Sequence, residues 1–124
     1  MSVRKKILIV EDDYSSKLYL NKALEKIDAE LLNAGDGREA LEILVSHPDV
    51  RLILMDIQMP VMDGYTCTKK IRESGSNVFI VAQTAYGLND DRDKMSALGF
   101  NDFMIKPISQ KVLVDMVSYY LSVN

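Results

Sequence analysis

The chain has 124 residues, which suits one domain and is too short for two. Hydrophobic residues make up 48% of it, so it can bury a core and is not an intrinsically disordered segment. Its 15 basic and 18 acidic residues give a net charge of −3, which disfavours direct binding to nucleic acid. No apolar run is long enough to insert in a membrane, no signal-peptide pattern is present, and the one cysteine, Cys67, can form no internal disulfide. We therefore expect a soluble, cytoplasmic protein with a single domain over residues 1–124.

The first half of the chain alternates between short apolar runs and segments of helical periodicity. Residues 6–10 predict a strand buried on both faces, which ends at the acidic run 11–13. A helix should follow with Ser15 or Ser16 as its N-cap and with apolar residues at helical spacing, namely Leu20, Ala23, Leu24 and Ile27. Residues 30–33 predict a second strand. The next helix should end before Pro48 and bury one face made of Leu41, Leu44 and Val45.

The second half continues the same alternation. Residues 52–55 give the strongest strand signal, ending on Asp56, and a turn-rich loop then leads to a helix that runs to about Glu73. A fourth strand is expected at 78–82, before Thr84, and a fifth at 102–105, before Lys106. The polar segment between them has only three apolar residues at helical spacing: Leu88, Met95 and Leu98. The last helix is well patterned, with Leu113, Met116, Val117, Tyr120 and Leu121 on one face.

This alternation of strands and helices predicts an α/β fold. Right-handed crossovers would place five parallel strands in one sheet with helices on both of its faces. In such doubly wound folds, ligands bind beyond the carboxyl ends of the strands. The residues at those ends are therefore the candidates for a functional site.

Acidic, hydroxyl and amino groups follow the strands at these ends. The first strand is followed by Glu11, Asp12 and Asp13, and the later strands end at Asp56, Thr84 and Lys106. Clustered carboxylates repel one another unless a cation neutralises them, and an oxygen-only cluster suits Mg²⁺ or Mn²⁺. A lysine and a threonine could bind phosphoryl oxygens, and an aspartate can become an aspartyl phosphate. The pattern indicates a phosphoryl acceptor with its metal.

Four motifs carry a resemblance to a known family. They are Ile-Leu-Ile-Val-Glu-Asp-Asp at 7–13, Leu-Met-Asp-Ile-Gln-Met-Pro-Val-Met-Asp-Gly at 54–64, Thr-Ala at 84–85 and Lys-Pro at 106–107. In this order, they closely resemble the receiver domain of two-component response regulators over essentially the whole chain. The resemblance implies a flavodoxin-like (βα)5 fold with strand order 2-1-3-4-5. The loop after Asp56 and the Lys106-Pro107-Ile108 run look most like receivers of hybrid histidine kinases.

The resemblance also implies roles for the acidic residues. Asp56 would be the phosphoacceptor and would share the metal ion with Asp12 as a direct ligand. Glu11 would support the ion through water, and the backbone carbonyl of Gln58 would complete the protein's share of the metal shell. Asp13 follows the acidic pair of the family without belonging to it, so we expect a lesser role for it.

Other positions would bind the phosphoryl group or report its presence. Thr84 would donate a hydrogen bond to it, and Lys106, preceding a proline through a bond that is cis in the family, would pair with it. Thr84 and Phe103 would act as switch residues, with phenylalanine standing where tyrosine is common. Gln58 and Tyr86, two residues beyond Asp56 and Thr84, occupy positions that tune the lifetime of the phosphate in this family.

The implied function is phosphorelay signalling without enzymatic turnover. The phosphodonor would be a phosphohistidine on a histidine kinase or a histidine phosphotransfer domain. The surface of the fourth helix, fifth strand and fifth helix would then change its binding to a downstream protein target.

Three alternatives compete with this function. A Mg²⁺-dependent aspartyl-phosphate hydrolase or phosphotransferase commonly has a second aspartate two residues after the nucleophile, where this chain has Gln58. A flavin-binding electron carrier would need a phosphate cradle after the first strand, where three acids stand here. A binding module that works without phosphorylation would not need the complete set of site residues.

Overall fold

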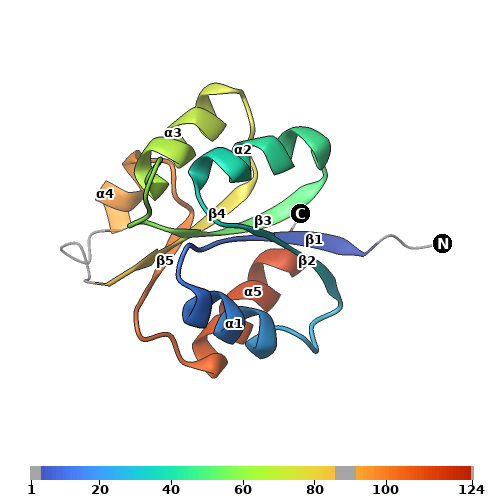
Figure 1. Ribbon diagram of the computed structural model, residues 1–124. Coiled ribbons are helices and arrows are strands. Elements are labelled where there is room, and N and C mark those ends of the chain that lie inside the picture. Colours follow the sequence, from blue (N-terminus) through green and yellow to red (C-terminus); the bar gives the residue numbers. More distant parts are fainter. Residues whose placement is uncertain (1–3, 86–91, 124) are drawn as a thin grey trace.

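Five parallel strands form one sheet in the order β2-β1-β3-β4-β5 in the computed structural model, which describes residues 4–85 and 92–123 (Figure 1). The strands are β1 (Lys5–Val10), β2 (Ala29–Ala34), β3 (Val50–Asp56), β4 (Phe79–Thr84) and β5 (Asp102–Ile105). The helices are α1 (Tyr14–Ala23), α2 (Gly37–Ser46), α3 (Gly64–Glu73), α4 (Arg92–Ala97) and α5 (Gln110–Ser122). The predicted fold class, strand order and alternation of elements are therefore confirmed.

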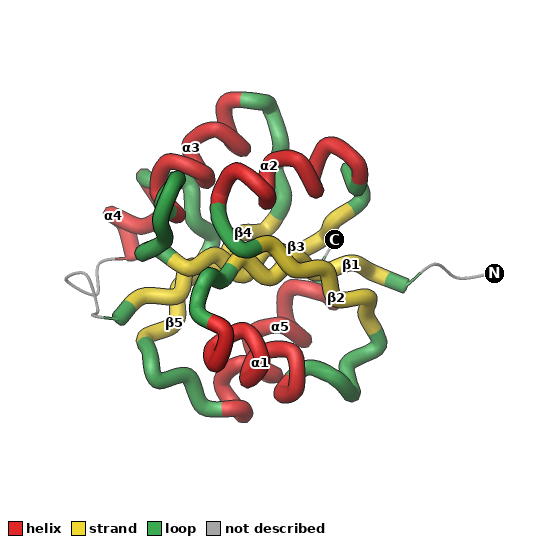
Figure 2. Tube along the Cα trace, in the orientation of Figure 1, coloured by secondary structure: helices red, strands yellow, loops and turns green. Residues whose placement is uncertain are grey.

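The molecule has three layers. Helices α1 and α5 cover one face of the sheet, and α2, α3 and α4 cover the other, as the trace coloured by secondary structure also shows (Figure 2). Each face has its own hydrophobic cluster: Ile7 and Ile9 of β1 pack with α1 and α5, whereas Leu8 and Val10 pack with the opposite layer. Because both faces are covered, the strands read as continuous apolar runs in the sequence. None of the described helices has the length and apolar character needed to cross a lipid bilayer.

Two local predictions were wrong. Asp13, not Ser15 or Ser16, is the N-cap of α1, because its carboxylate accepts a hydrogen bond from the Ser16 backbone N–H at 2.8 Å. A carboxylate at this position also interacts favourably with the positive end of the helix dipole. Val45 is 83% exposed, because the buried stripe of α2 follows Gly37, Ala40 and Leu44 and passes beside it.

The guanidinium group of Arg72 ties the end of α3 to the loops that precede β4 and β5. It donates to the carbonyl oxygens of Gly99 at 2.9 Å, Ser76 at 3.2 Å and Val78 at 2.6 Å. It also donates to the Asn101 side-chain oxygen at 2.9 Å, which in turn accepts from the backbone N–H of Ile80. Burial lowers the pKa of Arg72. The planar fork of donors serves here as a cross-link between three backbone segments.

Arg72→Lys should therefore reduce the free energy of unfolding by about 2 kcal/mol, because an ammonium cannot reach four separate acceptors and leaves partly buried carbonyls unpaired. Urea unfolding followed by circular dichroism measures the loss. Arg38→Lys is the matched control, since Arg38 is exposed and pairs with Glu42 one turn away. Equal effects of the two substitutions would contradict the cross-linking role of Arg72.

Candidate functional site

The carboxyl ends of β1, β3 and β4 and the residue that follows β5 open into one cleft of about 750 Å³. Seven residues singled out from the sequence line it together: Glu11, Asp12, Asp13, Asp56, Gln58, Thr84 and Lys106. Phe103 lies on β5 and is not part of this lining. Tyr86 lies outside the described residues. The parallel topology thus gathers side chains that are up to 95 positions apart in the sequence.

The loop after β3 is held close to the strand that carries Asp56. The backbone N–H of Gly64 donates to the Ile57 carbonyl at 2.9 Å, and a Cβ at Gly64 would lie only 2.3 Å from the Asp56 carbonyl oxygen. The Asp-Gly pair in the sequence follows from this geometry: Asp63 caps α3, and Gly64 permits the close approach. The same loop contains Val61 with φ of 69°, a strained value for a β-branched residue.

Lys106 is the cation that pairs with the acidic cluster among the described residues. Its Nζ lies 3.1 Å from Asp56 Oδ1 and 3.5 Å from Glu11 Oε1. Both acids are almost fully buried, at 3% and 1% exposure. Burial alone would lower the pKa of Lys106, but the charges of Asp56 and Glu11 outweigh it and raise the pKa.

The cluster has more negative charge than Lys106 can neutralise. Burial raises the pKa of Glu11 to about 7, and the neighbouring Asp56 carboxyl group adds to the effect. The Asp13 backbone N–H, which donates to Glu11 Oε2 at 3.2 Å, and the charge of Lys106 offset only part of it. A further positive charge at this place would therefore stabilise the ionised cluster.

The donor set fits a hard divalent cation. Glu11, Asp12 and Asp56 each place one carboxylate oxygen within 4.8 Å of the others. Oxygen-only ligands on an open cleft suit Mg²⁺ or Mn²⁺, which keep several waters in their coordination shell. Asp12 is exposed, so one side of the group is open to solvent. Gln58 also lines the cleft and is exposed.

Thr84 and Lys106 are brought together at the far side of the cleft. Thr84 is buried at the end of β4, and its carbonyl accepts a hydrogen bond from the Lys106 backbone N–H at 2.8 Å. The Lys106–Pro107 bond is cis, as the resemblance implied. The two residues thus share one backbone contact at the edge of the sheet.

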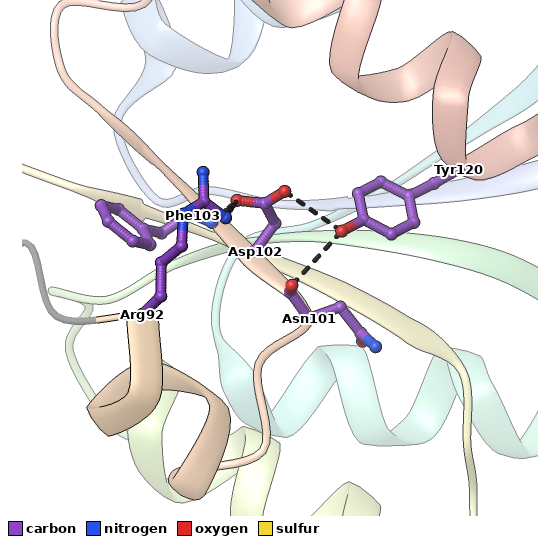
Figure 3. Close-up of polar contacts among 5 residues, drawn as sticks. All are labelled: Arg92, Asn101, Asp102, Phe103 and Tyr120. Carbon is purple, nitrogen blue, oxygen red and sulfur yellow. Dashed lines mark hydrogen bonds and ion pairs between the residues drawn. The ribbon is translucent and has the colours of Figure 1, made fainter.

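Phe103 lies next to a polar network, centred on Asp102, that joins β5 to α4 and α5. The Arg92 guanidinium lies 5.8 Å from the Phe103 ring centroid and 3.1 Å from the Asp102 carboxylate. From the other side, the Tyr120 hydroxyl of α5 lies 3.1 Å from the same carboxylate and 3.3 Å from the Asn101 carbonyl (Figure 3). Burial and then the charge of Asp102 raise the pKa of Tyr120 to about 12.

Sequence reasoning did not assign Gln83 to the cleft, which it also lines. It is 1% exposed, and its Cα is paired in register with that of Asp56 on the adjacent strand. The sequence signal was present, because Gln83 is an amide that directly follows the apolar run from Phe79 to Ala82. Its position directly before Thr84 made it look like the end of a strand.

Comparisons with known proteins agree with this fold and cleft. The sequence model of the response regulator receiver domain matches residues 7–118. The chain is 39% identical over 111 residues to the probable transcriptional regulator ycf27 of Cyanophora paradoxa, covering 89% of this chain and 45% of that protein. It is 36% identical over 121 residues to the hybrid signal transduction protein dokA of Dictyostelium discoideum, covering 92% and 7%. The structure of chemotaxis protein CheY4 from Vibrio cholerae superimposes with a TM-score of 0.86 at 25% identity, covering 95% of this chain and 99% of that one.

The fold and the acidic cleft thus define a signalling domain of the doubly wound α/β class. The chain belongs to the response regulator receiver domain family of two-component signalling systems. It spans less than half the length of the curated relatives compared above.

The raised pKa of Glu11 predicts that stability depends on pH. The carboxyl group has an ordinary pKa of 4.5 and a pKa of about 7 in the folded protein. Between these values the folded state holds the extra proton, so stability falls as the pH rises from 4.5 to about 7. Glu11→Gln removes this loss. Without divalent cations it should raise the free energy of unfolding by about 1–3 kcal/mol above roughly pH 8, and by little below about pH 4.

Urea unfolding in the presence of a chelator, repeated across this pH range, measures the difference between the two proteins. Glu30→Gln, at an exposed position of β2, is the matched control. Added Mg²⁺ should reduce the difference in free energy of unfolding between Glu11→Gln and the parent protein. The parent has one more carboxylate with which to bind the cation, so the cation should stabilise the parent more. A gain in Glu11→Gln that is the same at acidic and neutral pH would contradict the raised pKa.

Proposed function

We propose that this domain accepts a phosphoryl group on Asp56 from a phosphohistidine of a histidine kinase or a histidine phosphotransfer domain. The observation that supports this most directly is the ion pair of Lys106 with a nearly buried Asp56, beside two further carboxylates. A carboxylate held at the end of a buried strand, next to a lysine and a threonine, is placed to attack phosphorus and to have its product stabilised.

In the proposed reaction, an Asp56 carboxylate oxygen forms a bond to phosphorus as the bond from phosphorus to the donor nitrogen breaks. Lys106 would move from Asp56 to the phosphoryl oxygens, and the Thr84 hydroxyl would donate to another of them. Glu11, Asp12, Asp56 and the Gln58 carbonyl would hold Mg²⁺ or Mn²⁺, whose charge would offset that of the carboxylates and the phosphoryl oxygens.

The proposed output is a change in the surface formed by α4, β5 and α5. Thr84 would move toward the phosphoryl group, and Phe103 would turn inward into the space that this movement opens. Asp102, next to Phe103, forms an ion pair with Arg92 of α4 and accepts a hydrogen bond from Tyr120 of α5. A change in the position of β5 would therefore reach both helices. The surface carries exposed apolar side chains for a protein target, including Ile105, Val112 and Tyr119.

The remaining assignments rest on the family resemblance. Gln58 would tune the lifetime of the phosphate from its exposed position on the cleft, as would Tyr86, which lies outside the described residues. We propose that residues 1–124 act as one receiver unit in the cytoplasm. A histidine kinase partner is supported by the hybrid signalling proteins among the relatives.

Incubation with Mg²⁺ and a small acyl-phosphate donor should add one phosphoryl group to the protein, seen as a mass increase by intact mass spectrometry. Asp56→Asn should remove the adduct entirely, because an amide is not a nucleophile for phosphorus. A chelator should prevent its formation. Asp13→Asn is the matched control: asparagine also caps helices, so α1 and the adduct should both be retained.

The absence of any adduct on a correctly folded parent protein would refute the proposed function. Continuous release of inorganic phosphate over many turnovers would favour the hydrolase instead. An adduct that persists in Asp56→Asn would place the acceptor elsewhere.

The proposed movement of Phe103 can be followed by ¹⁹F NMR. The chain has three phenylalanines, so fluorinated phenylalanine should give three assignable resonances. Phosphorylation should shift the resonance of Phe103, because its ring leaves the Arg92 guanidinium. Phe100, whose ring lies edge-on to that of Tyr65 in α3 with 6.0 Å between the ring centroids, serves as the internal control and should move less. A Phe103 resonance that is unchanged by phosphorylation would exclude it as a switch residue.

A further inference from the structure

Gln83 has a buried amide with an unused hydrogen-bond donor. Its Nε2 is buried and has no hydrogen-bond partner among the residues that the structure describes. An unpaired buried donor destabilises a protein, and most such groups in proteins find partners. We therefore looked for a hydrogen-bond acceptor that Gln83 Nε2 could reach in another state of the domain.

The strand register identifies which group could supply that acceptor. Gln83 is paired with Asp56 on β3 and with Met104 on β5. Val81 and Leu54, two residues earlier on β4 and β3, both face α1 and α5, so Gln83 and Asp56 project to that same face. Side chains in register on neighbouring strands start about 5 Å apart, which a glutamine amide can span. Asp56 offers carboxylate oxygens, whereas Met104 offers only a thioether.

In the resting structure, Lys106 holds Asp56 Oδ1 at 3.1 Å. Glu11 lies in the same cluster, with a carboxylate oxygen within 4.8 Å of one of Asp56. The carboxyl group of Asp56 thus contacts Lys106 and lies beside Glu11 in the cleft. Transfer of Lys106 to a phosphoryl group would remove its contact with the carboxyl group of Asp56, next to the unused donor of Gln83.

We propose that Gln83 is a catalytic residue for loss of the phosphoryl group: its Nε2–H donates to the carboxyl oxygen of phosphorylated Asp56. This inference rests on the proposed function. In hydrolysis, a water oxygen forms a bond to phosphorus, the bond from phosphorus to the Asp56 oxygen breaks, and its electron pair returns to the carboxylate. The water proton leaves with inorganic phosphate or to solvent. A donor on the carboxyl group stabilises the charge that forms there, so Gln83 shortens the lifetime of the phosphorylated state.

Gln83→Met tests this directly, because methionine has similar length and volume but no N–H. The variant should fold at least as stably as the parent, since it lacks the unpaired donor. It should accept a phosphoryl group from an acyl-phosphate donor and, after the donor is removed, lose it about three to ten times more slowly. Gln110→Met, at an exposed position at the start of α5, is the matched control and should lose the group at the parental rate.

A second measurement on the parent protein does not depend on the variant's folding. The side-chain amide resonance of Gln83 in a ¹H–¹⁵N spectrum, assigned by its disappearance in Gln83→Met, should shift downfield on phosphorylation as the new hydrogen bond forms. Phosphoryl loss from a folded Gln83→Met at the parental rate or faster overturns the proposal, as does an unshifted amide resonance. In both cases phosphorylation of the parent still supports Asp56 as acceptor, whereas a parent without any adduct refutes the proposed function itself.

Discussion

The structure of the cleft depends on one constraint: two nearly buried carboxyl groups share a single ammonium group. Burying an ion costs free energy that only close partners recover, and Lys106 lies 3.1 Å from Asp56 and 3.5 Å from Glu11. Burial raises the pKa of Glu11 to about 7, and the neighbouring Asp56 adds to the rise, because one positive charge cannot neutralise both acids. The rest of the fold serves to keep these groups together. The three side chains come from the residue after β1, the last residue of β3 and the residue after β5, and their spacing is fixed by a sheet whose two faces are packed with apolar residues.

The sheet also connects the cleft to the distant face of α4, β5 and α5. The Thr84 carbonyl and the Lys106 backbone N–H are hydrogen-bonded, so the two residues that would contact a phosphoryl group lie on the same strand pair. Phe103 and Asp102 belong to that pair, and Asp102 is bonded to Arg92 and Tyr120 (Figure 3). A displacement of the carboxyl end of β4 would therefore act on β5 directly, and on both helices through one carboxylate. The cleft and this surface are therefore coupled through one shared strand, β5, without a long chain of intermediate residues.

The strands and their order could be predicted because each carries a run of apolar residues that a doubly covered sheet requires. The acidic cluster could be predicted because parallel topology places all carboxyl ends at one edge. The missed features depend on contacts that no local pattern encodes. Asp13 caps α1 because the helix begins at Tyr14, whereas the sequence alone makes Ser15, two positions later, an equally good cap. Arg72 reads as a surface arginine of α3, yet it bonds to four groups in segments up to 29 residues away.

Gln83 is a further residue whose role in the cleft could not be predicted from a local sequence pattern. It also shows that some interactions in the unphosphorylated state are incomplete. Three features of this state are left without full compensation: the shared charge of Glu11 and Asp56, the Gln83 Nε2, which has no hydrogen-bond partner among the described residues, and the strained φ of Val61 in the adjoining loop. All of them lie at one end of the sheet, away from the well-packed core. A cation or phosphoryl group that binds there would satisfy charges and donors that the protein itself leaves open, so its binding energy would act on the folded state directly. The cleft would then be least stable when empty, and the free energy released by filling it would be available to move β4 and β5.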